Sequence, residues 1–441
     1  MNWKFRNVRP NVSGIRKQYR GQRPAFGALL AGAVLLFVPM GCSDLLTVDP
    51  NPNVVDAGRE VSLQEAMVGA AVELYRAVDE KISHAGLFGG EFVSASTGPL
   101  HRMFGARQVT AEAQQGTTGS GRGQSLGGGF YIPLQRLVAV ARLNQDRILE
   151  GAFAEIPSGG ADSPQFARLA LYEGLGKLYL ADLYCTTAFY GGGPEFTTEA
   201  TYQQAEAHLT DAINASSAES EVRQAALLFR ARVRLILGDE GGALSDAQQV
   251  APDFEFLVTY SSATVEQRNR LQVHTWDVGD WSVGPQFRQL TIDDTELLDP
   301  RTLVDGPSQA FDASQELWAP LKASSPSDPI RIASGDEARY IVAEITGGQT
   351  AVDIINEVRA RHGITQFWTP EASDPDEIRD KIIDERFRTL FLEGTHMGDL
   401  RRYITKYDLD LFPTDNPHGL EVGDLTCLPM PAIERDNNPG L

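Results

Sequence analysis

Apolar side chains recur every third or fourth residue over long parts of the chain, which is the spacing of amphipathic helices. The first such stretch opens with Ser62 and Glu65, whose spacing matches a capping box and predicts a helix over about 62–80. Ser163, followed directly by a proline, predicts another helix start, and that helix should end near residue 184. The pattern therefore predicts a mainly α-helical fold.

Three groups of small and branched residues repeat the same spacing of +4 and +3. They are Ala205, Leu209 and Ala212; Ala243, Ala247 and Val250; and Ala351, Ile355 and Val358. A further helical pattern precedes each group, and glycines precede the last two groups at the expected turns. Paired helices with small residues at their crossing and a glycine turn are typical of tetratricopeptide-like hairpins. Any amphipathic helix also repeats at +4 and +3, so ordinary helix packing stays open.

The helical spacing is interrupted between the second and third of these groups. Residues 251–330 hold seven prolines and little helical period, which predicts a loop-rich insertion and a candidate ligand-binding region. A second stretch, 86–129, is rich in Gly, Ser and Thr and also favours loops. We therefore predict one large domain, with an N-terminal helical part over 62–250, the insertion, and a C-terminal helical part over 331–441.

The N-terminus has the order of an export signal. The first 23 residues carry seven basic side chains and no acid, and an apolar run from Ala25 to Met40 follows. That run is roughly 16 residues long, which is short of the ~20 needed to span a bilayer. We therefore predict a signal peptide over 1–41.

A cysteine directly follows this signal. Gly41 before Cys42 favours cleavage at this bond and attachment of a lipid to the thiol, with an extended tether over 42–61. Pro39 stands where lipoprotein signals usually carry leucine. An ordinary secretory signal or a short anchor with an incidental cysteine therefore stays open.

The charge of the chain argues against nucleic acid as a partner. Loss of the signal removes seven of the 39 basic residues and none of the 59 acidic ones, so the net charge falls from −20 to near −27. The densest arginine cluster, 386–402, is interleaved with acids and apolar residues, and we interpret it as structural. No later stretch is apolar over a length that spans a bilayer, so we expect a soluble body held at the membrane by its lipid.

The cysteines and histidines do not predict a metal site. Cys185 and Cys427 could pair in an oxidising compartment, but the sequence does not decide whether they do. The seven histidines are scattered, without a His-Glu-x-x-His or Cys-x-x-Cys motif. We therefore expect no zinc site and no cofactor, and whether a structural calcium ion binds stays open.

A series of motifs follows in order along the second half of the chain. They are Leu298-Asp299-Pro300-Arg301; Ser327 to Arg331 leading into Ala338 to Glu344; Ile355, Asn356 and Val358 to Arg361; Ile383-Asp384-Glu385-Arg386 with Leu390, Phe391, Glu393 and Gly394; Asp399 to Arg402; and Leu428 to Pro431 with Glu434, Asn438 and Pro439. In this order they resemble the successive landmarks of the SusD-like (RagB/SusD) family of outer-membrane nutrient-binding lipoproteins. The resemblance extends to Cys42 and its Ser-Asp-Leu-Leu tether.

This resemblance implies a lipoprotein at the outer membrane, facing the cell exterior. Such a protein lies over a TonB-dependent (SusC-like) transporter and holds an oligosaccharide, a polysaccharide or another nutrient for import. The resemblance also implies that tetratricopeptide-like hairpins meet the transporter, and that the protein binds without catalysis. Thr389 and His396 depart from the usual Glu and Arg, and the insertion is shorter than in many members, which leaves the ligand class open.

Sugar capture needs flat aromatic faces with polar groups beside them. The candidates lie in the insertion and beside the glycine-rich stretch: Trp276, Trp281, Trp318, Phe104, Phe130 and Tyr131. Trp276 and Trp281, with two aspartates between them, are the predicted platform. The alternative is that the tryptophans cover the insertion's own core and that Phe130 and Tyr131 pack onto their helix.

Two other functions compete with nutrient capture. A tetratricopeptide scaffold of the cell envelope would predict uninterrupted repeats and no aromatic insertion. A surface glycosidase would need two carboxylates roughly 5 to 9.5 Å apart across a cleft. Asp293, Asp294, Glu296 and Asp299 supply acids, but their polar surroundings give no reason for a raised pKa. We therefore predict binding rather than catalysis.

Overall fold

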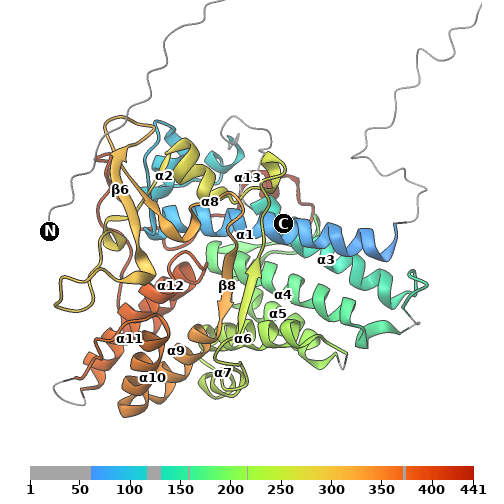
Figure 1. Ribbon diagram of the computed structural model, residues 1–441. Coiled ribbons are helices and arrows are strands. Elements are labelled where there is room, and N and C mark those ends of the chain that lie inside the picture. The colour runs from blue at the N-terminus through green and yellow to red at the C-terminus, as the bar shows by residue number, and fades with distance from the viewer. Residues whose placement is uncertain (1–60, 117–130, 157–158, 216, 371–373) are drawn as a thin grey trace, which may run out of the picture. The chain divides into compact units, whose positions relative to one another are not determined.

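The structure is a computed structural model, and it describes residues 61–116, 131–156, 159–215, 217–370 and 374–441 (Figure 1). The predicted signal peptide, Cys42 and Phe130 lie outside the described residues. None of the helices in these ranges combines the length and the apolar character needed to cross a bilayer.

Helices make up most of the secondary structure, as predicted. They are α1 Leu63–Gly89, α2 Pro99–Gly105, α3 Tyr131–Leu149, α4 Pro164–Leu183, α5 Thr198–Asn214, α6 Ser220–Leu237, α7 Glu240–Ala247, α8 Arg270–Gln272, α9 Gly335–Thr346, α10 Gly348–Arg361, α11 Pro375–Thr389, α12 His396–Tyr407 and α13 Ala432–Asn437. The strands are β1 Phe92–Ser94, β2 Thr186–Thr187, β3 Phe196–Thr197, β4 Glu255–Val258, β5 Trp281–Val283, β6 Val304–Gln309, β7 Glu316–Pro320 and β8 Ile330–Ser334.

The capping signals place the helix starts correctly. The backbone N–H of Glu65 donates to Ser62 Oγ at 3.2 Å, and the Glu65 carboxylate accepts from the Ser62 N–H at 3.0 Å. Helix α1 extends nine residues beyond the predicted end at 80, because its last turns are almost entirely buried, Lys81 and Ser83 included, so the polar positions there do not mark an exposed face. It stops at Gly90, whose φ of +90° ends the helix in the left-handed conformation.

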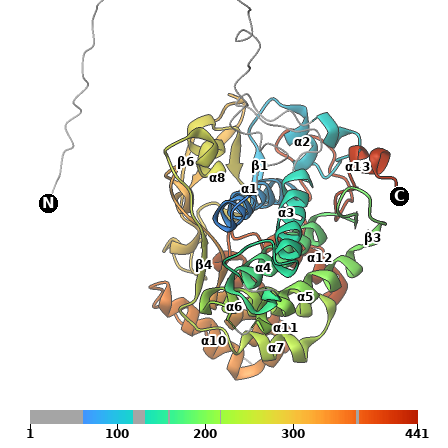
Figure 2. The same cartoon turned by 90° about the vertical axis from the view of Figure 1, so that its right-hand side faces the viewer.

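Consecutive helices pack side by side in chain order from α3 to α7, as Figure 1 and Figure 2 show. Small residues permit this close packing. A Cβ on Gly174 of α4 would lie 2.8 Å from Leu209 of α5, and one on Gly176 would lie 2.8 Å from Val138 of α3. Helix α9 packs in turn against α10 and α7. The predicted fold of helical hairpins is confirmed.

The predicted insertion, 251–330, consists mainly of loops with short strands and turns. Each strand pairs antiparallel with a single partner: β4 with β8, β5 with β1, and β6 with β7. The β5–β1 pair joins the insertion to a segment that precedes it in the sequence, and the β4–β8 pair joins it to the segment that follows. The insertion therefore has a fixed connection to the helical scaffold.

Buried ion pairs connect the insertion to the C-terminal helices. Arg301 Nη1 donates to Glu385 Oε2 at 2.7 Å, and Arg359 Nε donates to Glu385 Oε1 at 2.9 Å. At the next position of α11, Arg386 Nε donates to Asp399 Oδ2 at 2.7 Å. All five side chains are buried. This confirms that the dense charges of the C-terminal motifs are structural partners of one another.

Cys185 and Cys427, whose pairing the sequence left open, form a disulfide with a Cα–Cα distance of 5.2 Å. The backbone runs alongside the bridge: Cys185 N–H donates to Leu428 O at 2.9 Å, and Leu428 N–H donates to Leu183 O at 2.7 Å. The bridge therefore joins the end of α4, and the loop that follows it, to the C-terminal segment.

Candidate functional site

The structure corrects the predicted tryptophan platform at Trp281. This residue lies in β5, is 1% exposed, and stacks on the His274 ring at 3.7 Å between centroids. The rings of His84 and His101 pack edge-on against it, each at 5.6 Å. Because its ring is enclosed by these neighbours, it offers no free face to a sugar.

Trp318, Phe104 and Tyr131 are buried as well. Trp318 in β7 is 7% exposed, and the Arg288 guanidinium lies 5.7 Å from its ring. Phe104 belongs to the main core, and the Tyr131 hydroxyl donates to the backbone oxygen of Ala188 at 3.1 Å. These aromatic rings stabilise the fold in the conformation described, and they do not present a binding surface.

Trp276 has a different environment. It lies in a π-helical turn, Val273–Val278, and it is half-buried. Its indole N–H donates to Pro320 O of β7 at 3.1 Å, so the ring is fixed by one edge. Of the predicted candidates that the structure describes, Trp276 is the one residue that is not fully buried.

Phe311 is an aromatic residue that the sequence analysis did not select. It follows β6 at the turn of the β6–β7 hairpin and is 60% exposed. Its N–H donates to Gly279 O at 2.8 Å, and the next N–H, of Asp312, donates to Ala95 O at 2.8 Å. The backbone that carries the exposed ring is therefore anchored where three separate segments of the chain meet.

A glycine permits this approach of the hairpin. Gly279 has a φ of +71° and ends the π-helical turn that carries Trp276. A Cβ at this position would lie 3.2 Å from the Leu317 side chain and 3.6 Å from the Phe311 nitrogen. The conformation of residue 279 thus brings Phe311 next to the turn of Trp276.

Polar groups belong to the same turn as Phe311 or are paired with that turn. Arg102 Nη2 and Asp312 Oδ2 form an ion pair at 2.8 Å, and neither side chain is fully buried. Hydrogen bonds from Ser314 lower the pKa of Asp312, so that its carboxylate stays charged at neutral pH. Gln315 N–H donates to the Asp312 backbone oxygen at 2.8 Å. We call this set, Phe311, Trp276, Val278, Arg102, Asp312 and Gln315, the Phe311 surface.

Two of the four candidate acids for a glycosidase, Asp293 and Asp299, are paired with basic side chains. Hydrogen bonds from Arg359 hold the pKa of Asp293 well below its usual range. Burial raises the pKa of Asp299, but Arg301 outweighs burial and lowers it. A general acid requires a raised pKa, so this pair does not have the properties of a hydrolase site. In the part of the chain that the structure describes, no group of three or more His, Cys, Asp or Glu is placed to hold a metal ion.

Comparisons with solved structures show which fold this is. A SusD superfamily protein from Bacteroides vulgatus has a TM-score of 0.62 at 14% identity, and the match covers 85% of this chain and 96% of that one. The surface glycan-binding protein A from Bacteroides uniformis has a TM-score of 0.62 at 15% identity, covering 86% and 98%. A SusD-like carbohydrate binding protein from Bacteroides vulgatus has a TM-score of 0.55 at 15% identity, covering 77% and 82%.

These identities are low, so the solved structures show a shared fold. Among curated proteins, none matches the sequence. Residues 337–440, which include most of the C-terminal motifs, match the model of the SusD family. The C-terminal part of the chain thus resembles the SusD family in sequence, and the described residues have the SusD-like fold.

Proposed function

We propose that this protein binds a glycan on the outside of the cell and passes it to a TonB-dependent transporter in the outer membrane. SusD family proteins are non-catalytic binding proteins. The observation that carries the proposal is Phe311, a large aromatic side chain held 60% exposed at the meeting point of three segments. Two proteins of the same fold are named for glycan or carbohydrate binding.

An exposed aromatic ring with polar neighbours fits a sugar. The C–H face of a pyranose covers the ring, and transfer of ~80 Å² of apolar surface out of water contributes about 2 kcal/mol. Arg102, Asp312 and Gln315 supply donors and acceptors for the hydroxyl groups around that face. The half-buried ring of Trp276 lies one turn from Gly279 and extends the apolar surface. The Phe311 surface thus combines the two kinds of contact that hold a glycan.

The Phe311→Ala variant tests this site, with Trp276→Ala as a second variant. The full-length protein in detergent would be titrated calorimetrically with hexasaccharides of glucose, xylose, mannose and galactose. We expect Phe311→Ala to weaken binding of the preferred hexasaccharide at least tenfold, or about 1.4 kcal/mol. Phe367→Ala is the matched control, because Phe367 is also 60% exposed but lies between α10 and α11. Wild-type affinity in Phe311→Ala, or no glycan binding by folded wild type, would contradict the proposal.

The proposal includes a lipid on Cys42 and a position in the outer membrane. Its support is the order of basic, apolar and Gly-Cys residues at the N-terminus, together with the family match. Because Cys42 is the residue that carries the lipid in this proposal, we expect the Cys42→Ala variant, expressed in its native cells, to appear in the soluble fraction instead of the membrane fraction. The wild-type protein should co-purify with a TonB-dependent transporter. An unmodified Cys42 in the mass spectrum of the membrane-bound protein would refute the lipid anchor.

A further inference from the structure

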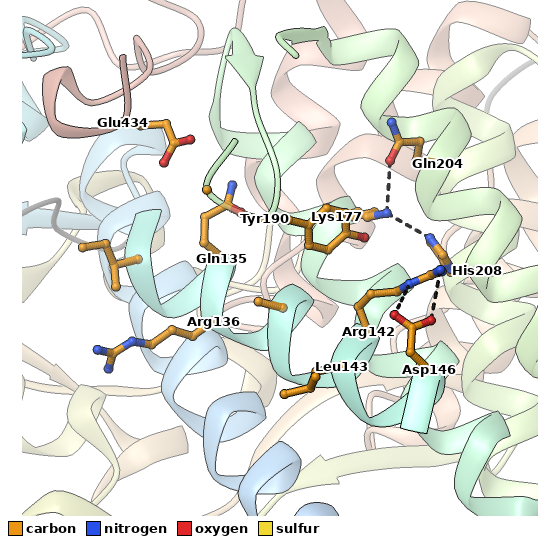
Figure 3. A pocket seen from close by; sticks show the side chains of 13 residues that line it. Gln135, Arg136, Arg142, Leu143, Asp146, Lys177, Tyr190, Gln204, His208 and Glu434 are labelled. Carbon is orange, nitrogen blue, oxygen red and sulfur yellow. Dashed lines mark hydrogen bonds and ion pairs between the residues drawn. The ribbon is translucent and has the colours of Figure 1, made fainter. Parts of the chain in front are cut away.

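A groove with a volume of about 910 Å³ opens on the helical hairpins and shares no residue with the Phe311 surface (Figure 3). It lies along α3, α4 and α5 and is bordered by the loop after α4. The side chains that carry the argument are Gln135, Arg142, Lys177, Tyr190, Gln204 and His208. This volume is at the upper end of the range for small-molecule sites in proteins.

Tyr190 occupies the groove in an unusual conformation. Its backbone φ is +63°, and that of Gly191 is +67°, so two consecutive residues are left-handed. For a residue other than glycine this conformation costs about 1–2 kcal/mol. The side chain is nevertheless 51% exposed, so burial of the ring does not explain why the strain persists. Strained backbone conformations cluster at active sites and ligand-binding sites, which makes Tyr190 a candidate ligand contact.

A buried carboxylate holds the Tyr190 ring in place. The Tyr190 hydroxyl donates to Glu173 Oε1 at 2.5 Å, and Gln145 Nε2 donates to Glu173 Oε2 at 2.7 Å. Lys177 Nζ lies 3.0 Å from Glu173 Oε1 and 5.5 Å from the centre of the Tyr190 ring. Burial raises the pKa of Glu173, but hydrogen bonding to His208 and the charge of Lys177 outweigh it and lower the pKa to about 2. The carboxylate therefore stays charged and keeps the ring oriented at neutral pH.

Further polar groups line the groove, and two of them contact Lys177, which lies over the Tyr190 ring. Lys177, which is buried, donates to Gln204 Oε1 at 3.0 Å and contacts His208 Nε2 at 2.9 Å, as Figure 3 shows. The exposed guanidinium of Arg142 is paired with Asp146 at 3.1 Å. These amide, imidazole and guanidinium groups can exchange hydrogen bonds with hydroxyl groups of a ligand.

We infer that this groove is a second ligand site, which binds a few sugar units of an oligosaccharide with one ring stacked on Tyr190. The apolar ring and its polar neighbours match the two faces of a pyranose. The pairing of Arg142 with Asp146 balances charge locally and favours an uncharged glycan. This inference goes beyond the proposed function, because the groove and the Phe311 surface are built from different residues.

Substitution of Tyr190 by glycine gives the sharpest test. Tyr190→Gly removes the ring and its hydrogen bond to Glu173, while glycine adopts a positive φ without strain, so relief of strain offsets part of the loss and we expect the variant to fold. The assay is calorimetric titration of the full-length protein with the four hexasaccharides. We expect wild type to show two binding sites. The affinity of one of them should fall at least tenfold in Tyr190→Gly and stay unchanged in Phe311→Ala.

A pair of glutamines on α5 supplies the matched control. Gln204 lines the groove, whereas Gln203 is exposed next to it and hydrogen-bonds to Glu199 at 3.4 Å. We expect Gln204→Ala to weaken the Tyr190-dependent site severalfold and Gln203→Ala to leave it unchanged. If folded Tyr190→Gly binds the hexasaccharides as wild type does, while Phe311→Ala loses binding, this inference is overturned. The proposed function would remain intact in that case. Absence of hexasaccharide binding, or transporter peptides binding the groove in place of sugar, also overturns it.

Discussion

Glu385→Ala is expected to lower the free energy of unfolding by about 3–5 kcal/mol, which is the usual cost of breaking a buried ion pair by removing one partner. Glu385 is fully buried on α11 and accepts from both Arg301 and Arg359. Without this carboxylate, two guanidinium groups would remain buried with fewer partners. One of them belongs to the insertion and the other to α10, so the connection between these parts would weaken.

Urea denaturation followed by circular dichroism at neutral pH measures this effect. Asp380→Ala is the matched control, because Asp380 lies on the same helix but is exposed, and we expect a change within about 0.5 kcal/mol. Burial raises the pKa of Glu385, but Arg301 and Arg359 outweigh it, so the folded-state pKa lies below the ordinary 4.5. Its stabilisation is therefore present above about pH 4.5 and is lost as pH falls through the folded pKa. A neutral-pH change below 1 kcal/mol would refute the structural role of Glu385.

Cys427→Ser is expected to lower the free energy of unfolding by about 2–5 kcal/mol. The disulfide joins residues 242 positions apart, and so long a loop restricts the unfolded chain strongly. Thermal unfolding of wild type and variant, each with and without dithiothreitol, measures the effect. Reduction should bring wild type to the stability of Cys427→Ser and leave the variant unchanged. Equal stability of oxidised wild type and variant would show that the bridge does not contribute.

Local signals in the sequence were sufficient to predict the helices and the structural role of the charged motifs. Capping requires only residues three apart, so Ser62 and Glu65 reveal a helix start without any tertiary information. The end of α1 was missed because its last turns are almost entirely buried, so the polar positions there do not mark an exposed face. Arg301 and Glu385 were recognised as parts of separate motifs, and the structure adds that they contact each other.

Exposure of the aromatic residues could not be read from the sequence. Trp281 is buried because β5 pairs with β1, a contact between residues almost 190 positions apart. Phe311 is exposed because its backbone, rather than its ring, is anchored to Gly279 and Ala95. At Tyr190 the three glycines that follow were a visible signal for unusual backbone, but the groove beside it depends on how α3, α4 and α5 pack.

A crystal structure of the protein with its most tightly bound hexasaccharide measures glycan capture most directly. We expect a sugar ring stacked on Phe311, with carbon atoms about 4 Å from the aromatic ring. Its hydroxyl groups should hydrogen-bond to at least one of Arg102, Asp312 and Gln315. A saturated complex in which every sugar lies elsewhere and Phe311 remains exposed to solvent would contradict capture at this surface.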